Sequence, residues 1–130
     1  MTLSEDAVLK RLKSVDNTQE SIETLALWTM HHKDSVDVIC SGWLNSFRTA
    51  SEKHRQALLY LTNDVCQKAK RKRLDQLREA FKPCLSEAAT YVRYVHPSRF
   101  FYWFTVFPIF IYFGEIELCY QVLTAFKAYA

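Results

Sequence analysis

Five side chains between residues 60 and 71 have the types and the spacing needed to hydrogen-bond an extended ligand. They are Tyr60, Asn63, Asp64, Gln67 and Arg71, at i, i+3, i+4, i+7 and i+11, which is one face of an α-helix. A carboxylate accepts hydrogen bonds and a carboxamide both accepts and donates, so this face can bond a peptide main chain while the tyrosine ring forms an apolar wall. The competing interpretation is the solvated side of an amphipathic helix.

The helix that must carry this face is predicted over residues 51–71, with Ser51 as its N-terminal cap. A second, mostly apolar stripe follows the helical spacing on another face: Leu58, Leu61, Thr62, Val65, Cys66 and Ala69. Asn and Asp are mediocre helix formers, and an exposed mid-helix position would more cheaply hold Glu, Lys or Ala. Their presence at positions 63 and 64 favours a binding role for the polar face.

A basic cluster follows at the end of the same predicted helix: Lys68, Lys70, Arg71, Lys72 and Arg73. Cations at a helix C-terminus complement the helix dipole, which is a purely structural explanation. The functional alternatives are a nuclear import signal and attraction for a phosphorylated ligand, and these two do not exclude each other.

Other kinds of chemistry find little support in the sequence. The four histidines and four cysteines show no metal-site spacing, and no glycine-rich elbow or phosphate loop accompanies the Ser, His and Asp residues. We therefore expect no catalysis, no metal, no cofactor and no small-molecule substrate. The net charge of +3 is too small to demand a nucleic-acid partner. The cysteines are expected to be reduced, and no secretion signal is recognised.

The composition predicts an all-α fold with a single core. Only two glycines and three prolines occur in 130 residues, while 49% of the residues are hydrophobic. Besides residues 51–71, helical periodicity predicts helices over residues 4–15, 17–33, 34–47 and 77–92. Ser4, Asn17 and Asp34 are the expected caps of the first three, and Pro83 kinks the last helix or begins a new one. Short helices in series suggest a stack of helix pairs.

The character of the sequence changes after Arg93. Residues 100–113 are apolar or aromatic except for Thr105 and Pro108. A bilayer-spanning helix of about twenty residues would have to include Glu115 and Glu117 or reach back to Arg99, which makes this run a poor transmembrane segment. The run must therefore pack on the helices, bind a partner or aggregate, and all three alternatives stay open.

Consecutive strings in residues 4–93 resemble the CID, or CTD-interacting domain, family, and most of all its RPRD and Rtt-type regulators. The strings are residues 17–22 (NTQESI), 25–28 (LALW), His31-His32 and, most specifically, residues 59–67 (LYLTNDVCQ) leading into residues 70–72 (KRK). The resemblance implies a right-handed superhelix of short helices, as in VHS, ENTH and CID domains. In that fold the second, fourth and seventh helices form a groove for the heptad-repeat tail of RNA polymerase II.

The resemblance also implies roles for individual residues. Tyr60, Asn63 and Asp64 match the peptide-contacting positions of the family, and Asn17 and Gln19 match positions near the phosphate of a modified heptad serine. An anion site at a helix N-terminus agrees with the helix dipole. No residue of the segment 94–130 matches the three later helices of the family or the phosphate-reading arginine of the seventh. Binding weaker than that of complete members is expected.

We therefore expect residues 1–93 to form a CID-like helical domain, followed by an atypical apolar segment at residues 94–130. The expected function is recognition of the phosphorylated heptad repeats of the largest RNA polymerase II subunit, in the nucleus, during transcription termination or pre-mRNA 3′-end processing. Two alternatives remain. The chain is a truncated or alternatively spliced product that no longer binds, or it is a membrane-associated trafficking adaptor like the related VHS and ENTH proteins.

Overall fold

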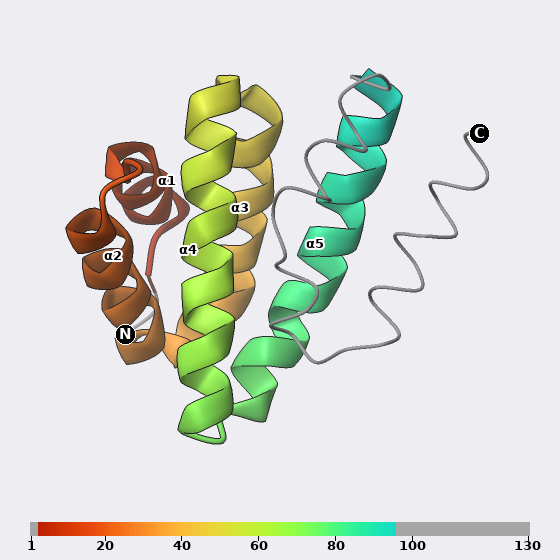
Figure 1. Cartoon of the computed structure of the whole chain (residues 1–130). Helices are drawn as coiled ribbons and strands as arrows, with labels where there is room; N and C mark the ends of the chain where they lie inside the picture. Colours follow the sequence, from red (N-terminus) through yellow and green to blue (C-terminus); the bar gives the residue numbers. More distant parts are fainter. Residues whose placement is uncertain (1–2, 96–130) are drawn as a thin grey trace.

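The computed structural model describes residues 3–95, which form five α-helices and one 3-10 turn (Figure 1). In chain order these are α1 (Glu5–Ser14), α2 (Gln19–His31), η1 (Lys33–Ser35), α3 (Val36–Thr49), α4 (Glu52–Arg71) and α5 (Asp75–Val95). The described residues contain no strand, so the prediction of an all-α fold is confirmed for them.

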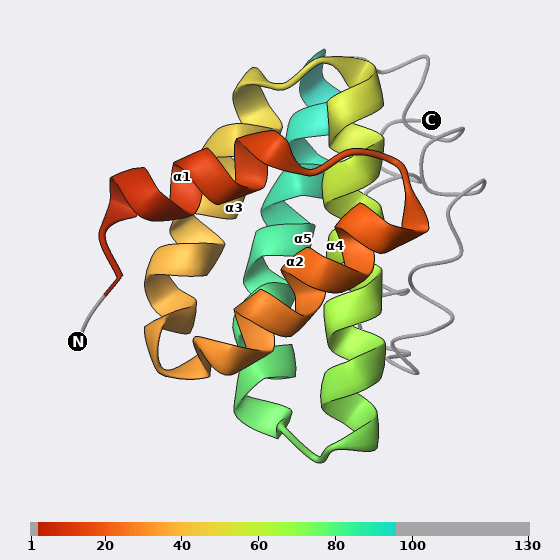
Figure 2. The same cartoon turned by 90° about the vertical axis from the view of Figure 1, so that its left-hand side faces the viewer.

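Helices α3 and α4 form the middle of the described region. Helix α1 packs on α3 and α2 packs on α4, while α5 packs on both α3 and α4. The first two helices therefore lie on one side of the central pair and α5 lies on the other (Figure 1). After a quarter turn, α1 and α2 are seen crossing in front of α3 and α4 (Figure 2). This arrangement places the predicted polar face of α4 next to α2.

A single core joins all five helices. Its largest fully buried side chains are Trp43, Phe47, Phe81, Leu12, Ile39, Leu58, Leu59, Leu61 and Leu77. The apolar stripe predicted on α4 is buried at every position. On α3, Leu44 is half-buried and five apolar residues are buried: Val36, Ile39, Cys40, Trp43 and Phe47. The indole N–H of Trp43 donates to the carbonyl oxygen of Leu58 at 3.1 Å, so the largest core residue leaves no buried donor unpaired.

Arg55 is a buried cation that ties the end of α3 to α4 and α5. Its Nε donates to the carbonyl oxygen of Phe47 at 2.9 Å, and one terminal nitrogen donates to the carbonyl of Arg48 and the hydroxyl of Tyr91. The last carbonyls of a helix have no partner within it, so Arg55 satisfies them from the neighbouring helix. These bonds fix where α4 begins relative to α3.

Of the four expected helix caps, two are confirmed and two are wrong. Ser4 caps α1 as predicted, as does Ser51 at α4, but the cap of α2 is Thr18, whose hydroxyl accepts from the Ser21 N–H at 3.2 Å. The prediction of Asn17 as this cap was wrong, because Asp16 binds the Thr18 N–H at 2.9 Å and holds Thr18 in the capping position. Asp34 was wrong too: it lies within η1, which leads into α3 without a side-chain cap.

Helix α5 runs through Pro83 as one helix, so Pro83 does not begin a new one.

Gly42 marks a close approach between α1 and α3, since a Cβ atom at this buried position would lie 2.7 Å from Cγ1 of Val8. No disulfide joins Cys40, Cys66 and Cys84, the three cysteines among the described residues. Cys119 and the aromatic run at residues 100–113 lie outside the described residues.

Two further features of residues 3–95 bear on other kinds of function. None of their helices combines the length and the apolarity needed to cross a membrane. The same residues contain no group of three or more His, Cys, Asp or Glu side chains placed to hold a metal ion.

Candidate functional site

A cleft of about 480 Å³ lies between the first two turns of α2 and the middle of α4. It is lined by Asn17, Gln19, Ile22, Glu23, Gln56, Tyr60, Asn63 and Asp64. Residues 17 and 19 are far in sequence from residues 60–64, yet all five of these predicted site residues line one cleft. The packing of α2 on α4 brings them together.

The Asn17 end of the cleft is held by the turn between α1 and α2. The carboxylate of Asp16 accepts hydrogen bonds from the N–H and the hydroxyl of Thr18, and these bonds hold the pKa of Asp16 below its usual value. Because Thr18 supplies the cap of α2, the side chain of Asn17 is not needed there and lines the cleft instead. Asn17 therefore does not cap α2, but it remains a candidate for contacting a ligand in the cleft.

The α4 wall combines one exposed ring with two half-buried polar groups. Tyr60 is 41% exposed, although its neighbours Leu59 and Leu61 are buried. Asn63 and Asp64 follow one turn later and are half-buried. A residue at i+3 or i+4 on a helix lies beside residue i, so the ring and both polar groups open on the same space.

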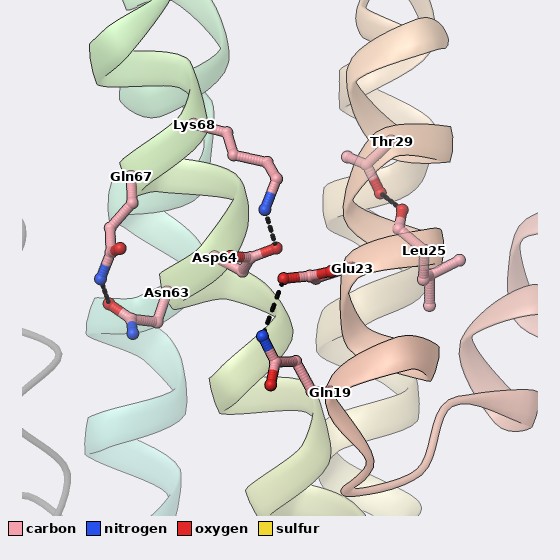
Figure 3. A network of polar contacts seen from close by, with 8 residues as sticks. All are labelled: Gln19, Glu23, Leu25, Thr29, Asn63, Asp64, Gln67 and Lys68. Atoms are coloured by element: carbon pink, nitrogen blue, oxygen red, sulfur yellow. Dashed lines mark hydrogen bonds and ion pairs between the residues drawn. The ribbon is translucent and has the colours of Figure 1, made fainter.

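Three polar contacts set the orientation of the cleft side chains (Figure 3). Lys68 Nζ lies 2.6 Å from Asp64 Oδ2, Gln67 Nε2 donates to Asn63 Oδ1 at 3.3 Å, and Gln19 Nε2 donates to Glu23 Oε1 at 3.1 Å. Each contact joins residues one turn apart on the same helix. Within residues 3–95, no hydrogen bond engages Asp64 Oδ1 or the amide nitrogen of Asn63. One acceptor and one donor therefore remain available to a ligand.

Gln67 has a different position from the one its spacing predicted. It does not line the cleft, and it contacts the cleft through Asn63, whose amide oxygen it binds. This bond orients the Asn63 amide, so Gln67 affects the cleft indirectly, through the position of Asn63.

Sequence reasoning missed three lining residues: Ile22, Glu23 and Gln56. Glu23 follows Gln19 by four residues and Gln56 precedes Tyr60 by four, so helical spacing offered a signal for both. Ile22 is half-buried, with part of its surface at the cleft. Which face of α2 meets α4 was the missing information.

The structure divides the basic cluster. Lys68 lies next to the cleft through its contact with Asp64, whereas Lys70, Arg71, Lys72 and Arg73 are exposed at the end of α4 and in the turn after it. Arg73 has a positive φ of 58° and lines another hollow together with Asp34, Asp37 and Asp75. The five cations are therefore not one surface.

The cleft has an acidic lining. It contains the carboxylates of Glu23 and Asp64, and none of its eight described lining residues is a lysine or an arginine. Lys68 partly balances this charge from one side. At the other end, Lys53 and Asp16 lie in an adjoining hollow that shares Asn17 with the cleft.

Comparison with known proteins identifies the family. The sequence matches the family model of the CID domain over residues 6–99. It is 38% identical over 91 residues to the Mus musculus and Homo sapiens proteins named Regulation of nuclear pre-mRNA domain-containing protein 1B, which covers 70% of this chain and 28% of each relative. It is 37% identical over 89 residues to the Gallus gallus protein named Regulation of nuclear pre-mRNA domain-containing protein 1A, which covers 68% of this chain and 33% of that protein.

The matched part is thus about a third or less of the length of these relatives. It includes every residue of the cleft, because these residues lie between positions 17 and 64 and the family match runs from 6 to 99. The resemblance found in the short strings around residues 17–32 and 59–72 is confirmed. The chain belongs to the CID domain family.

Proposed function

We propose that this chain binds the phosphorylated heptad-repeat tail of the largest RNA polymerase II subunit, in the nucleus, and acts there in transcription termination or pre-mRNA 3′-end processing. The observation that carries the proposal is the cleft between α2 and α4. It gathers Asn17, Gln19, Tyr60, Asn63 and Asp64 into one hollow. The family resemblance implies peptide contacts at Tyr60, Asn63 and Asp64, and it implies that Asn17 and Gln19 lie near the phosphate of a modified heptad serine.

The chemistry of the cleft suits an extended or turned peptide. Asp64 Oδ1 can accept from a main-chain N–H, and the Asn63 amide nitrogen can donate to a main-chain carbonyl. The exposed Tyr60 ring gives an apolar wall against which a proline or a tyrosine can pack. In peptide-binding grooves, hydrogen bonds to the peptide main chain commonly provide affinity, and contacts with its side chains provide sequence specificity. Here the Tyr60 ring would provide the specificity.

The names of the relatives support the nuclear part of the proposal. Both the 1A and the 1B proteins are named as regulators of nuclear pre-mRNA. Because this chain matches only part of their length, the step at which it acts remains within the proposal. We infer binding without catalysis, small-molecule substrate or direct nucleic-acid contact, in keeping with the sequence expectations above.

Fluorescence anisotropy with a two-heptad peptide tests the proposal. The peptide is used unmodified, phosphorylated at the second-position serine, and with a scrambled sequence. Saturable binding of the heptad peptides and no binding of the scrambled one is the expected result. Asn63→Ala is expected to weaken binding about fivefold or more, since it removes a main-chain hydrogen bond.

Asn45→Ala is the matched control, because Asn45 is an exposed asparagine on α3 that does not line the cleft. It should leave affinity unchanged. Failure of every heptad peptide to bind would reject the proposal and support the alternative of a product that has lost binding. Flotation of the full chain with liposomes separately tests the membrane alternative.

A further inference from the structure

Lys68 differs from the other cations of the basic cluster in its surroundings. Its Nζ lies 2.6 Å from Asp64 Oδ2, and the two side chains are only 18% and 21% exposed. In the ion pairs Arg48–Glu87 and Lys82–Glu79 the acidic side chain is 56% and 60% exposed. The Lys68–Asp64 pair is therefore partly withdrawn from water, where charge interactions are screened less.

A phosphate entering the cleft would meet an unfavourable field. Glu23 and Asp64 are both acidic and line the cleft, while none of the eight lining residues is a lysine or an arginine. A phosphate group carries about −1.5 to −2 charges at neutral pH, so it requires a nearby cation to offset the repulsion. Figure 3 shows Lys68 reaching toward Asp64 from the next turn of α4, with Glu23 on the facing helix.

We propose that Lys68 is the residue by which the cleft distinguishes a phosphorylated heptad peptide from an unmodified one. This inference rests on the proposed function. An ammonium group has three N–H donors, and the Asp64 contact occupies one of them. A second can bond a phosphate oxygen of the peptide while Asp64 Oδ1 bonds the peptide main chain.

The pair thus has two roles with different ligand requirements. Lys68 orients Asp64 by donating to it, which helps every peptide, and its positive charge offsets a phosphate, which helps only the modified one. Lys53 is the competing candidate at the Asn17 end. It lies beside the carboxylate of Asp16, in the hollow next to the cleft. Lys70 on the same helix is exposed and has no contact with the cleft lining.

The test compares Lys68→Gln, Lys53→Gln and Lys70→Gln in the full chain. Each is titrated by anisotropy with unmodified and second-position phosphoserine peptides. Glutamine at position 68 can still donate to Asp64 but carries no charge. We expect Lys68→Gln to lower phosphopeptide affinity roughly tenfold and unmodified-peptide affinity less than about twofold, as fits one charge-assisted hydrogen bond. The other two variants should change both affinities by less than about twofold, and Lys68→Arg should restore the preference.

Each outcome is decisive. If the wild type prefers the phosphopeptide and Lys68→Gln keeps that preference, the inference is overturned while the proposed function stands. Selective loss in Lys53→Gln would place the phosphate at the Asn17 end and would also overturn it. If the wild type binds both peptides with equal affinity, the cleft does not distinguish them and the inference about Lys68 is overturned. If the wild type binds neither peptide, the proposed function is overturned as well.

Thermal melts of all variants check that they are folded. If Lys68→Gln proves unstable, the double variant Asp64→Asn, Lys68→Gln removes the uncompensated carboxylate. The phosphopeptide preference should still be absent from it. A preference that persists in the double variant counts against Lys68.

Discussion

At the scale of single residues, Asp64 is more constrained than a surface carboxylate. One of its oxygens contacts Lys68 and its side chain is 21% exposed, whereas the other oxygen has no hydrogen bond within residues 3–95. Asp64→Asn keeps the shape of the side chain and removes the charge. It should weaken the unmodified peptide by roughly tenfold, because a charge-assisted bond to the peptide becomes a neutral one. The phosphopeptide should lose less, because the same change removes a negative charge that repels the phosphate.

The same substitution should change stability little. An asparagine oxygen can still accept from Lys68, so the melting temperature is expected to fall by a few degrees at most. Binding and melting are measured on one preparation. A large drop in melting temperature with unchanged affinity of the folded fraction would mean that Asp64 is structural and not a ligand.

Asp16 gives a second prediction, which concerns pH. Hydrogen bonds from Thr18 lower the pKa of Asp16 in the folded state below 3.8, the ordinary value for an aspartate side chain. A carboxyl group with a lowered folded pKa stabilises the fold above its unfolded pKa, and this contribution disappears as pH falls through the folded pKa. Wild type should therefore melt at a higher temperature than Asp16→Ala at pH 7.

This difference should shrink progressively below about pH 3.8, where the carboxylate becomes protonated. Melting curves of both proteins from pH 7 to pH 2.5 provide the measurement. A gap that stays constant with pH would show that the charge of Asp16 is unimportant to the turn that presents Asn17.

At the scale of elements, the contact between α1 and α3 depends on the absence of a side chain at Gly42. A Cβ there would approach Cγ1 of Val8 to 2.7 Å, which is so close that the Val8 side chain or one of the two helices must shift. Overpacking of this kind typically costs about 1 to 3 kcal/mol, while replacing a helical glycine by alanine gains about 1 kcal/mol. We expect Gly42→Ala to destabilise the protein on balance.

The compensating variant makes this prediction specific. Val8→Ala alone should destabilise by leaving a cavity, but combined with Gly42→Ala it should recover part of the loss, because the new methyl group occupies the vacated space. Chemical denaturation of the four proteins gives the coupling energy. Additive losses would mean that the two helices do not meet as closely as described.

The helices themselves follow from local patterns, whereas their mutual orientation does not. The periodicity of residues 58–69 is sufficient to predict both the apolar and the polar face of α4. The cap of α2 could not be predicted, because Asn17 and Thr18 are both good caps and the choice depends on a bond from Asp16. The missed residues Glu23 and Gln56 belong to the cleft only because α2 packs on α4, which no local pattern specifies.

The charge pattern shows the same limit. Five cations within residues 68–73 look equivalent in sequence, and the sequence favours neither a structural nor a functional explanation for the cluster as a whole. In the structure only Lys68 lies at the cleft, because its position one turn after Asp64 directs it there. Local spacing was enough to pair these two residues, but the closeness of α2 was needed to give the pair a role.

At the scale of the whole molecule, residues 3–95 contain one continuous core that joins all five helices. A shortened chain ending at Val95 should therefore keep its helical circular dichroism and melt cooperatively. The comparison is the full chain under the same conditions. Complete loss of helicity on shortening would mean that residues 96–130 are required for the fold and would reject the proposed boundary near residue 93.

The contact between Cys84 and Cys40 provides an internal chemical reporter of how the molecule opens. Cys84 Sγ lies 3.5 Å from the carbonyl oxygen of Cys40, across the junction of α5 and α3. The Cys40 side chain lowers the pKa of Cys84, whereas the Cys84 side chain and burial raise the pKa of Cys40. A thiolate is the reactive form, so alkylation should modify Cys84 well before Cys40 or the buried Cys66.

The alkylation rates of the two buried thiols, Cys40 and Cys66, can then report on opening of the fold. Cys40 and Cys66 should become alkylated only when α5 separates from α3 and α4, so their rates measure that separation without any added label. Mass spectrometry of the digested protein resolves each cysteine, including Cys119 outside the described residues. A bound peptide that contacts only α2 and α4 should leave the alkylation rates of Cys40 and Cys66 nearly unchanged. That result would show that the two sides of the central helix pair open independently.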